Sequence, residues 1–188
     1  KRLILMNLEE KQLTSEYIYN GKIIKLRRDT ALLPNGKTST REVIEHNGGV
    51  CVAALTDSDE VLFVKQFRYP YMEVVTEIPA GKRDSADEDP LACGKRELKE
   101  ETGAEAESFI PLGKLYPSPG YCGEVIWMFA AMGLRYGEQH PDDDEFLSVE
   151  KIPLEKAVQM ILSGEITDAK TQAAVLKLKL LKDRGEID

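Results

Sequence analysis

The sequence predicts an α+β fold, in which helices cover a mixed β-sheet and a small antiparallel sheet precedes this sandwich. Two observations support the prediction. Segments rich in β-branched and aromatic residues, typical of strands, occupy most of residues 15–81 and return between 109 and 152. Helix-like segments are inserted once among the strands, at 90–102, and are appended twice after them.

The N-terminal part is predicted to form the small antiparallel sheet, here called the annex. Turn residues at Asn20-Gly21 and at 34–36 separate its strand-like segments. The run Asn47-Gly48-Gly49 is the predicted boundary, so we expect an annex at 1–47 and a main domain at 48–188. The annex strands are expected at 15–20, 21–33 and 38–46.

The main domain begins with a strand at 49–56 that is apolar on both faces, so it should lie in the middle of a sheet. The strand at 60–69 is expected to pair with it across the turn "DSDE". Two helices close the chain, one from Pro153 to Gly164 and one capped by Asp168. The remaining strands are expected at 74–81, 109–117, 124–134 and 146–152. The apolar side of the last helix is expected to carry Ala174, Leu176, Leu178, Leu180 and Leu181.

Composition excludes several partners. The net charge is −8 and the longest basic cluster is "KLRR" at 25–28, which argues against a nucleic-acid partner. An acidic protein can still bind a phosphorylated small molecule through a divalent cation. No apolar run approaches the roughly 20 residues of a membrane span, and no signal peptide is recognised. The cysteines, 51, 93 and 122, lack C-x-x-C or metal-ligand spacing, so we expect reduced thiols and a cytoplasmic protein.

An acidic helix is predicted at 90–102. Asp89 and Pro90 form a strong helix start, and Gly103 is a natural stop. At 100° per residue, three carboxylates fall within an arc of about 100° while Leu98 faces the core. These carboxylates are Glu97, Glu100 and Glu101.

Two interpretations of this helix stay open on spacing alone. A solvated charged face would use Lys95 and Lys99 as i,i+4 partners of the acids, each pair contributing a few tenths of a kcal/mol. Alternatively, the three carboxylates hold Mg²⁺ or Mn²⁺, because hard cations prefer oxygen ligands and offset the mutual repulsion of the acids.

The stretch "GKRDSADEDPLACGKRELKEETGA", residues 81–104, resembles the Nudix box, G-x5-E-x7-R-E-U-x-E-E-x-G-U, where U is a bulky apolar residue. Two departures are visible. Gly81 lies seven rather than six residues before Glu88, an insertion that could shift the carbonyl of Ala80, and Ala104 is small for its place. The residues in register are Glu88, Arg96, Glu97, Leu98, Glu100, Glu101 and Gly103. The resemblance implies the Nudix α/β/α sandwich.

The Nudix resemblance also implies site residues. Glu97, Glu100 and Glu101 would bind Mg²⁺, or Mn²⁺, together with the carbonyl of Ala80. Arg96 would pair with Glu88 and tie the loop to the helix. The catalytic group would comprise Glu145, Glu100 and Arg96, with Glu145 positioning or deprotonating the attacking water and Asp143 in reserve.

Other segments are similar to the ADP-ribose pyrophosphatase branch of the family. They are "TREVIEH" at 40–46, "KQFRYPY" at 65–71, "EIPAGK" at 77–82 and "YPSPGY" at 116–121. This similarity implies Arg41, Arg68, Glu77 and Pro119 as substrate-binding residues and a homodimer made through the annex. Arg41 and Arg68 could instead be plain surface cations.

The resemblance therefore implies Mg²⁺-dependent hydrolysis of the pyrophosphate bond of ADP-ribose to AMP and ribose 5-phosphate. One alternative is a hydrolase of another nucleoside diphosphate sugar, such as GDP-mannose. Another is a module that binds nucleotide sugars without cleaving them. The expected partners are a small nucleoside diphosphate sugar and a second copy of the chain, with no nucleic acid and no membrane.

Overall fold

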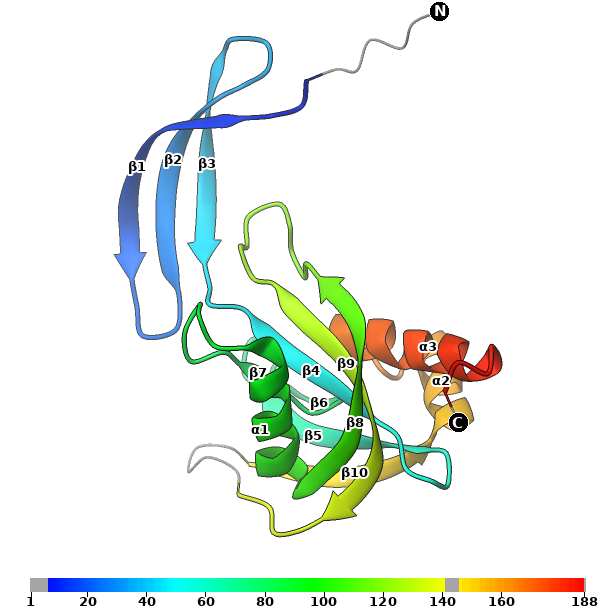
Figure 1. Ribbon diagram of the computed structural model, residues 1–188. Coiled ribbons are helices and arrows are strands. Elements are labelled where there is room, and N and C mark those ends of the chain that lie inside the picture. Colours follow the sequence, from blue (N-terminus) through cyan, green and yellow to red (C-terminus); the bar gives the residue numbers. More distant parts are fainter. Residues whose placement is uncertain (1–6, 141–145, 188) are drawn as a thin grey trace, which may run out of the picture. The chain divides into compact units, whose positions relative to one another are not determined.

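The computed structural model of the chain describes residues 7–140 and 146–187, which form two compact units (Figure 1). The first unit comprises the chain up to His46 together with Ser118–Glu124. The second comprises Asn47–Pro117 and the chain from Val125 onward.

The first unit is built on a three-stranded antiparallel sheet in the order β1-β2-β3, as predicted for the annex. Residues of 118–124 join it, because Ile44 N–H donates to the Tyr121 carbonyl and Gly123 N–H donates to the Ile44 carbonyl, both at 2.8 Å. β1 begins earlier than predicted and is exposed along its whole length. The strands are β1 (Lys11–Asn20), β2 (Lys25–Leu32) and β3 (Thr38–Glu45).

The second unit contains two sheets. A four-stranded sheet has the order β7-β4-β9-β8, and a three-stranded sheet has the order β10-β5-β6. The predicted mixed sheet is confirmed, because β4 runs parallel to β9 while β7 and β8 are antiparallel to their neighbours. The strands are β4 (Gly49–Ala54), β5 (Glu60–Arg68), β6 (Glu73–Glu77), β7 (Ala80–Lys82), β8 (Ala104–Leu115), β9 (Ile126–Tyr136) and β10 (Leu147–Pro153).

The predicted pairing of the strand at 49–56 with the strand at 60–69 is wrong. β4 is central and fully buried, as expected, but it pairs with β7 and β9, whereas β5 pairs with β6 and β10. A single bridge, Leu55 with Val61, connects the two strands. The turn closes locally, since the Thr56 N–H donates to the Glu60 carbonyl at 2.8 Å, but the pairing ends at this bridge and β5 continues in the second sheet.

The single strand predicted at 74–81 is in fact two strands in different sheets. The break falls at Ile78-Pro79, between β6 and β7. Proline has no N–H to donate to a sheet. The Ile78 N–H leaves the sheet as well, and donates to the Thr171 hydroxyl at 2.9 Å. The chain therefore crosses from one sheet to the other at this point.

The helix α1 (Pro90–Thr102) confirms the predicted start and stop. The Asp89 carboxylate accepts the Ala92 N–H at 2.8 Å, and Gly103 ends the helix in the left-handed region with φ of 68°. Its Leu98 is fully buried with Val52 and Ala54 of β4. These packing contacts fix which side of α1 faces the sheet, and hence where its acidic residues lie.

The opposite face of the four-stranded sheet is covered by α3 (Ala169–Asp183), so the sheet lies between helices, while α2 (Leu154–Leu162) packs against α3 and against β5 and β10 (Figure 1). Alternation along β4 separates the two faces, since Cys51 and Ala53 pack in the core that contains Ala174. Leu180, predicted on the buried side of α3, is 55% exposed because it lies well round the helix from Ala174. No helix of the described residues is long and apolar enough to cross a membrane.

The glycine inside α1 generates a stability prediction. A Cβ at Gly94 would lie 3.4 Å from Val52 Cγ2 and 3.6 Å from Phe129 Cδ2, which are ordinary contacts. Glycine within a helix costs about 1 kcal/mol relative to alanine. We expect Gly94→Ala to raise the free energy of unfolding by about 0.5–1 kcal/mol, measured by urea denaturation.

Gly103→Ala is the contrasting variant. Gly103 has φ of 68°, and a Cβ there would lie 2.6 Å from the Gly137 carbonyl oxygen, so this variant should be less stable than the wild type. A Gly94→Ala protein that also lost stability would contradict the room found between α1 and the sheet.

Candidate active site

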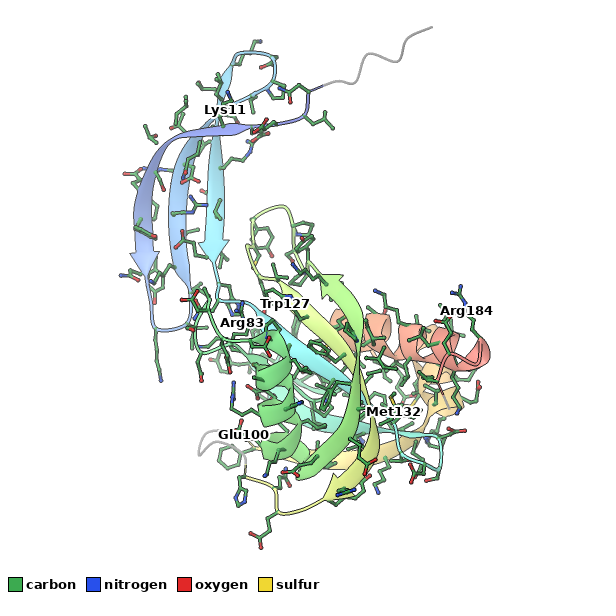
Figure 2. All side chains as sticks on the ribbon, in the orientation of Figure 1. Lys11, Arg83, Glu100, Trp127, Met132 and Arg184 are labelled. Carbon is green, nitrogen blue, oxygen red and sulfur yellow. The ribbon has the colours of Figure 1, made fainter. Side chains whose placement is uncertain are left out.

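The loop before α1 is organised by Arg83, whose importance the sequence did not reveal. This side chain is buried, and its guanidinium donates to the carbonyls of Asn47 (3.1 Å), Ala86 (2.5 Å) and Glu88 (2.9 Å). It also lies over the Trp127 ring, 4.7 Å from the centroid (Figure 2). The loop that contains the extra residue is therefore held from within.

Two acids of α1 are buried against β7. Glu97 is 8% exposed and Glu101 is 2% exposed. A Cβ on Gly81 would fall 1.9 Å from the Glu97 carboxyl carbon, so only glycine lets the strand approach this side chain. The Glu101 carboxylate accepts the Ala80 N–H at 3.0 Å. One turn apart, the two carboxylates face the same short strand.

Arg96 links the acids of the helix to the loop. Its Nη1 lies 2.8 Å from Glu97 Oε1 and 2.9 Å from Glu100 Oε2, and its Nη2 lies 3.5 Å from Glu88 Oε1. Burial by itself lowers the pKa of Arg96, but the neighbouring acids raise it by more, and the net shift is upward. The guanidinium thus stays charged and partly neutralises three carboxylates.

The donor set fits a hard divalent cation. Buried carboxylates are costly unless positive charge or hydrogen-bond donors lie near them, and Glu97 and Glu101 are held close together by their packing on Gly81 and Ala80. Carboxylate and carbonyl oxygens are the ligands that Mg²⁺ and Mn²⁺ prefer. Within residues 7–140 and 146–187, however, no three His, Cys, Asp or Glu side chains already form such a group. Glu100 is more exposed than the other two acids and is bonded to Arg96.

A second charged cluster lies at the end of β6. Glu77 is 2% exposed, and its two oxygens accept Arg68 Nε (2.5 Å) and Arg68 Nη2 (2.9 Å). Lys170, from the first turn of α3, donates to Glu77 and, at 3.0 Å, to Asp168. The sequence pointed to Arg68 and Glu77 but missed Lys170, which resembles any other lysine of an amphipathic helix.

The pKa shifts of this cluster favour the charged form of each side chain. Burial raises the pKa of Glu77, but the hydrogen bond from Arg68 and the charge of Lys170 lower it by more, and the net shift is downward. Burial lowers the pKa of Lys170, while Asp168 and Glu77 raise it by more. The pKa of Arg68 is raised, chiefly by its bond to Glu77. All three groups therefore stay ionised near neutral pH.

The other predicted residues are placed elsewhere. Arg41 and Pro119 belong to the first unit, where Arg41 is bonded to both oxygens of Glu10 at 2.7 and 2.9 Å. Glu145 and Asp143 lie outside the described residues. The chain that leads toward them is attached to the last turn of α1, because the His140 N–H donates to the Glu100 carbonyl at 2.9 Å.

Two family models match the chain. The model of the NUDIX domain matches residues 45–175, and the model of the nucleoside diphosphate sugar hydrolase N-terminal domain matches residues 10–44. The two matches meet close to the boundary between the annex and the second unit.

Individual relatives extend over nearly the whole chain. An ADP-ribose pyrophosphatase of Bacillus subtilis (strain 168) is 41% identical over 178 residues, 94% of this chain and 96% of that protein. A methanol dehydrogenase activator of Bacillus methanolicus is 41% identical over 174 residues, 92% of this chain and 94% of that protein. The crystal structure of an ADP compounds hydrolase has a TM-score of 0.82 at 20% identity, covering 96% of this chain and 99% of that chain, which confirms the predicted sandwich fold. The chain belongs to the Nudix family.

Proposed function

We propose that this chain hydrolyses the pyrophosphate bond of ADP-ribose with the help of Mg²⁺, yielding AMP and ribose 5-phosphate. The observation that carries the proposal is the pair of buried carboxylates, Glu97 and Glu101, packed against the backbone of Gly81 and Ala80. A helix that only exposes charge to solvent has no reason to bury two of its acids. The similarity to an ADP-ribose pyrophosphatase over nearly the full length of both chains supports this substrate.

The acids of α1 provide the cation site in this proposal. Glu97, Glu100 and Glu101, with the carbonyl of Ala80, would hold Mg²⁺ or Mn²⁺, which when bound neutralises phosphate oxygens and makes a water more nucleophilic. Arg96 fixes the side chains of Glu97 and Glu100 at 2.8 and 2.9 Å. The acids are therefore oriented before any substrate arrives.

Arg68 is the proposed phosphate ligand. Its Nε and Nη2 are held by Glu77, while the side chain remains 38% exposed. A guanidinium has a second edge of N–H groups, which can bind two phosphate oxygens at once. Glu145, with Asp143 in reserve, is the proposed acceptor of the proton from the attacking water. Arg41 and Pro119 remain proposed substrate contacts.

A panel of substrates tests this proposal. With Mg²⁺ present, we expect kcat/KM to be highest for ADP-ribose and AMP to be a product. A higher kcat/KM for GDP-mannose or another nucleoside diphosphate sugar would show that ADP-ribose is not the preferred substrate, but the proposed pyrophosphate hydrolysis would stand. Calorimetric binding of ADP-ribose without release of AMP would instead indicate a binding module. Identity alone does not select the substrate, because a relative with the same 41% identity is named a methanol dehydrogenase activator.

Glu101→Gln tests the cation site. The amide oxygen can still accept the Ala80 N–H, so the fold should persist, but the negative charge is lost. We expect kcat to fall by about 10²-fold or more, the order seen when one electrostatic group of an active site is removed. Saturating Mg²⁺ should raise the melting temperature of the wild type by more than that of the variant, because only binding to the folded state stabilises it.

Glu105→Gln is the matched control for this experiment. Glu105 is exposed, follows α1 closely in sequence, and pairs with Lys99 on the surface. Its loss should leave both kcat and the Mg²⁺-induced stabilisation unchanged. Near-normal turnover by Glu101→Gln would show that the cation site is misassigned.

The chain is further proposed to be a cytoplasmic homodimer. All residues of β1 are exposed, among them Leu13, Ile18 and Tyr19, and exposed apolar side chains that cluster on one strand are typical of interaction surfaces. None of the three cysteines is in a disulfide, which supports a reducing compartment.

Sedimentation equilibrium tests the homodimer. It should give twice the mass of the chain, and Leu13→Lys should shift the measured mass toward that of the monomer. A wild-type monomer at all concentrations would refute the homodimer.

A further inference from the structure

From the charged cluster at the end of β6 we infer that Lys170 is a positioning residue, which acts through Glu77 to aim Arg68 at the pyrophosphate of the substrate. The inference rests on the proposed function and adds a residue from α3, 93 positions away from Glu77 in sequence.

Lys170 is itself held firmly. Its side chain is 12% exposed, and its ammonium group donates to Glu77 and Asp168. The Asp168 carboxylate also caps α3, accepting the Thr171 N–H at 2.9 Å and the Thr171 hydroxyl at 2.6 Å. The start of the helix therefore determines where the ammonium group lies.

The Glu77 carboxylate, which Lys170 holds in place, orients the Arg68 guanidinium. Both of its oxygens are engaged, Oε1 by Arg68 Nε and Oε2 by Arg68 Nη2 and Lys170 Nζ. Carboxylate and guanidinium meet in a planar two-bond fork, so the orientation of one sets that of the other. Without the ammonium, the buried carboxylate would have one cationic partner and could rotate, and the exposed edge of Arg68 would turn with it.

The first turn of α3 also binds the segment that joins β6 to β7, which in turn contacts α1. Ile78 donates to Thr171, which is fully buried, and two residues later Ala80 donates to Glu101. Helix side chains thus contact the segment 77–80 at three points, two of them from α3 and one from α1. The proposed phosphate ligand and the proposed cation site are set by neighbouring residues of one short segment.

The two positive and two negative charges of the cluster balance. Arg68 and Lys170 are opposed by Glu77 and Asp168. A buried group with its charges matched resists distortion, and removing one member leaves another uncompensated. Lys170 is therefore needed for the geometry of Arg68, and both acceptors of its ammonium group named above are carboxylates of the protein.

A double-mutant cycle tests the inference, using Lys170→Met, Arg68→Ala and the double variant. We expect Lys170→Met to raise KM for ADP-ribose roughly 10-fold with kcat within about 3-fold, the size typical of losing a supporting contact. Arg68→Ala should raise KM by more. The double variant should match Arg68→Ala alone, because Lys170 acts only through Arg68.

Lys179→Met is the matched control. Lys179 lies on the same helix and is paired with Glu155 and Asp183, away from the cluster. Its kinetic constants should equal those of the wild type. Additive effects of Lys170→Met and Arg68→Ala on KM, or equal behaviour of Lys170→Met and Lys179→Met, would overturn the inference. If Lys170→Met does not fold, Lys170→Arg replaces it, since a guanidinium keeps the charge but cannot occupy the same buried point.

A second readout separates this inference from the proposed function. In arginine-¹⁵N-labelled protein, the Arg68 Nε–H should exchange slowly with solvent, and Lys170→Met should accelerate that exchange roughly 10-fold while Lys179→Met leaves it unchanged. The signal is assigned by its absence in Arg68→Ala. An unchanged exchange rate overturns the positioning role even in an active enzyme. Failure of the wild type to cleave any nucleoside diphosphate sugar refutes the proposed function, whatever the exchange shows.

Discussion

The arrangement of the site depends on the burial of two carboxylates, those of Glu97 and Glu101, against the backbone of β7. Charged groups leave water only where partners compensate them, and here the partners are the Ala80 N–H and the Arg96 guanidinium. The requirement explains the glycine at 81, since no side chain fits between the strand and Glu97. It also explains why α1 needs a firm start and stop. A helix that slid or rotated by one residue would bring these acids out of register with the strand.

Two helices from opposite faces of the sheet meet at the segment that joins β6 to β7. From one face α1 contributes the carboxylate that binds Ala80, and from the other α3 contributes the hydroxyl that binds Ile78 and the ammonium that binds Glu77. Pro79, between them, donates nothing and fixes the backbone angle. A sheet crossing would otherwise leave unpaired polar groups, and here side chains of the helices pair with them. The same bonds that satisfy the backbone also place the functional groups.

Local signals in the sequence predicted much of this fold, but they did not predict which strands pair or which side chains distant in sequence come into contact. Asp89, Pro90 and Gly103 act within a few residues of themselves, so the limits of α1 could be predicted well. The short turn before β5 looked like a hairpin because turn chemistry does not say which sheet the next strand enters. Pro79 was a visible sign that the predicted strand 74–81 would break. Lys170 and Arg83 gave no such sign, since bonds to backbone carbonyls leave no pattern in the sequence and the acid Glu77 lies 93 positions from Lys170.

The extra residue in the loop before α1 shows how such a site tolerates a change of length. Arg83, at the start of the loop, binds the carbonyl of Glu88 at its end and the carbonyl of Asn47 just before β4, and it rests on Trp127. Its charge is compensated by several carbonyl dipoles, so the loop can take an added residue between these anchor points without moving them. Downstream, the Asp84 N–H is bonded to the Glu88 side chain, which also faces Arg96. The insertion is thus absorbed before the first turn of α1, and Gly81 still meets Glu97 although the spacing between Gly81 and Glu88 is one residue longer than the box prescribes.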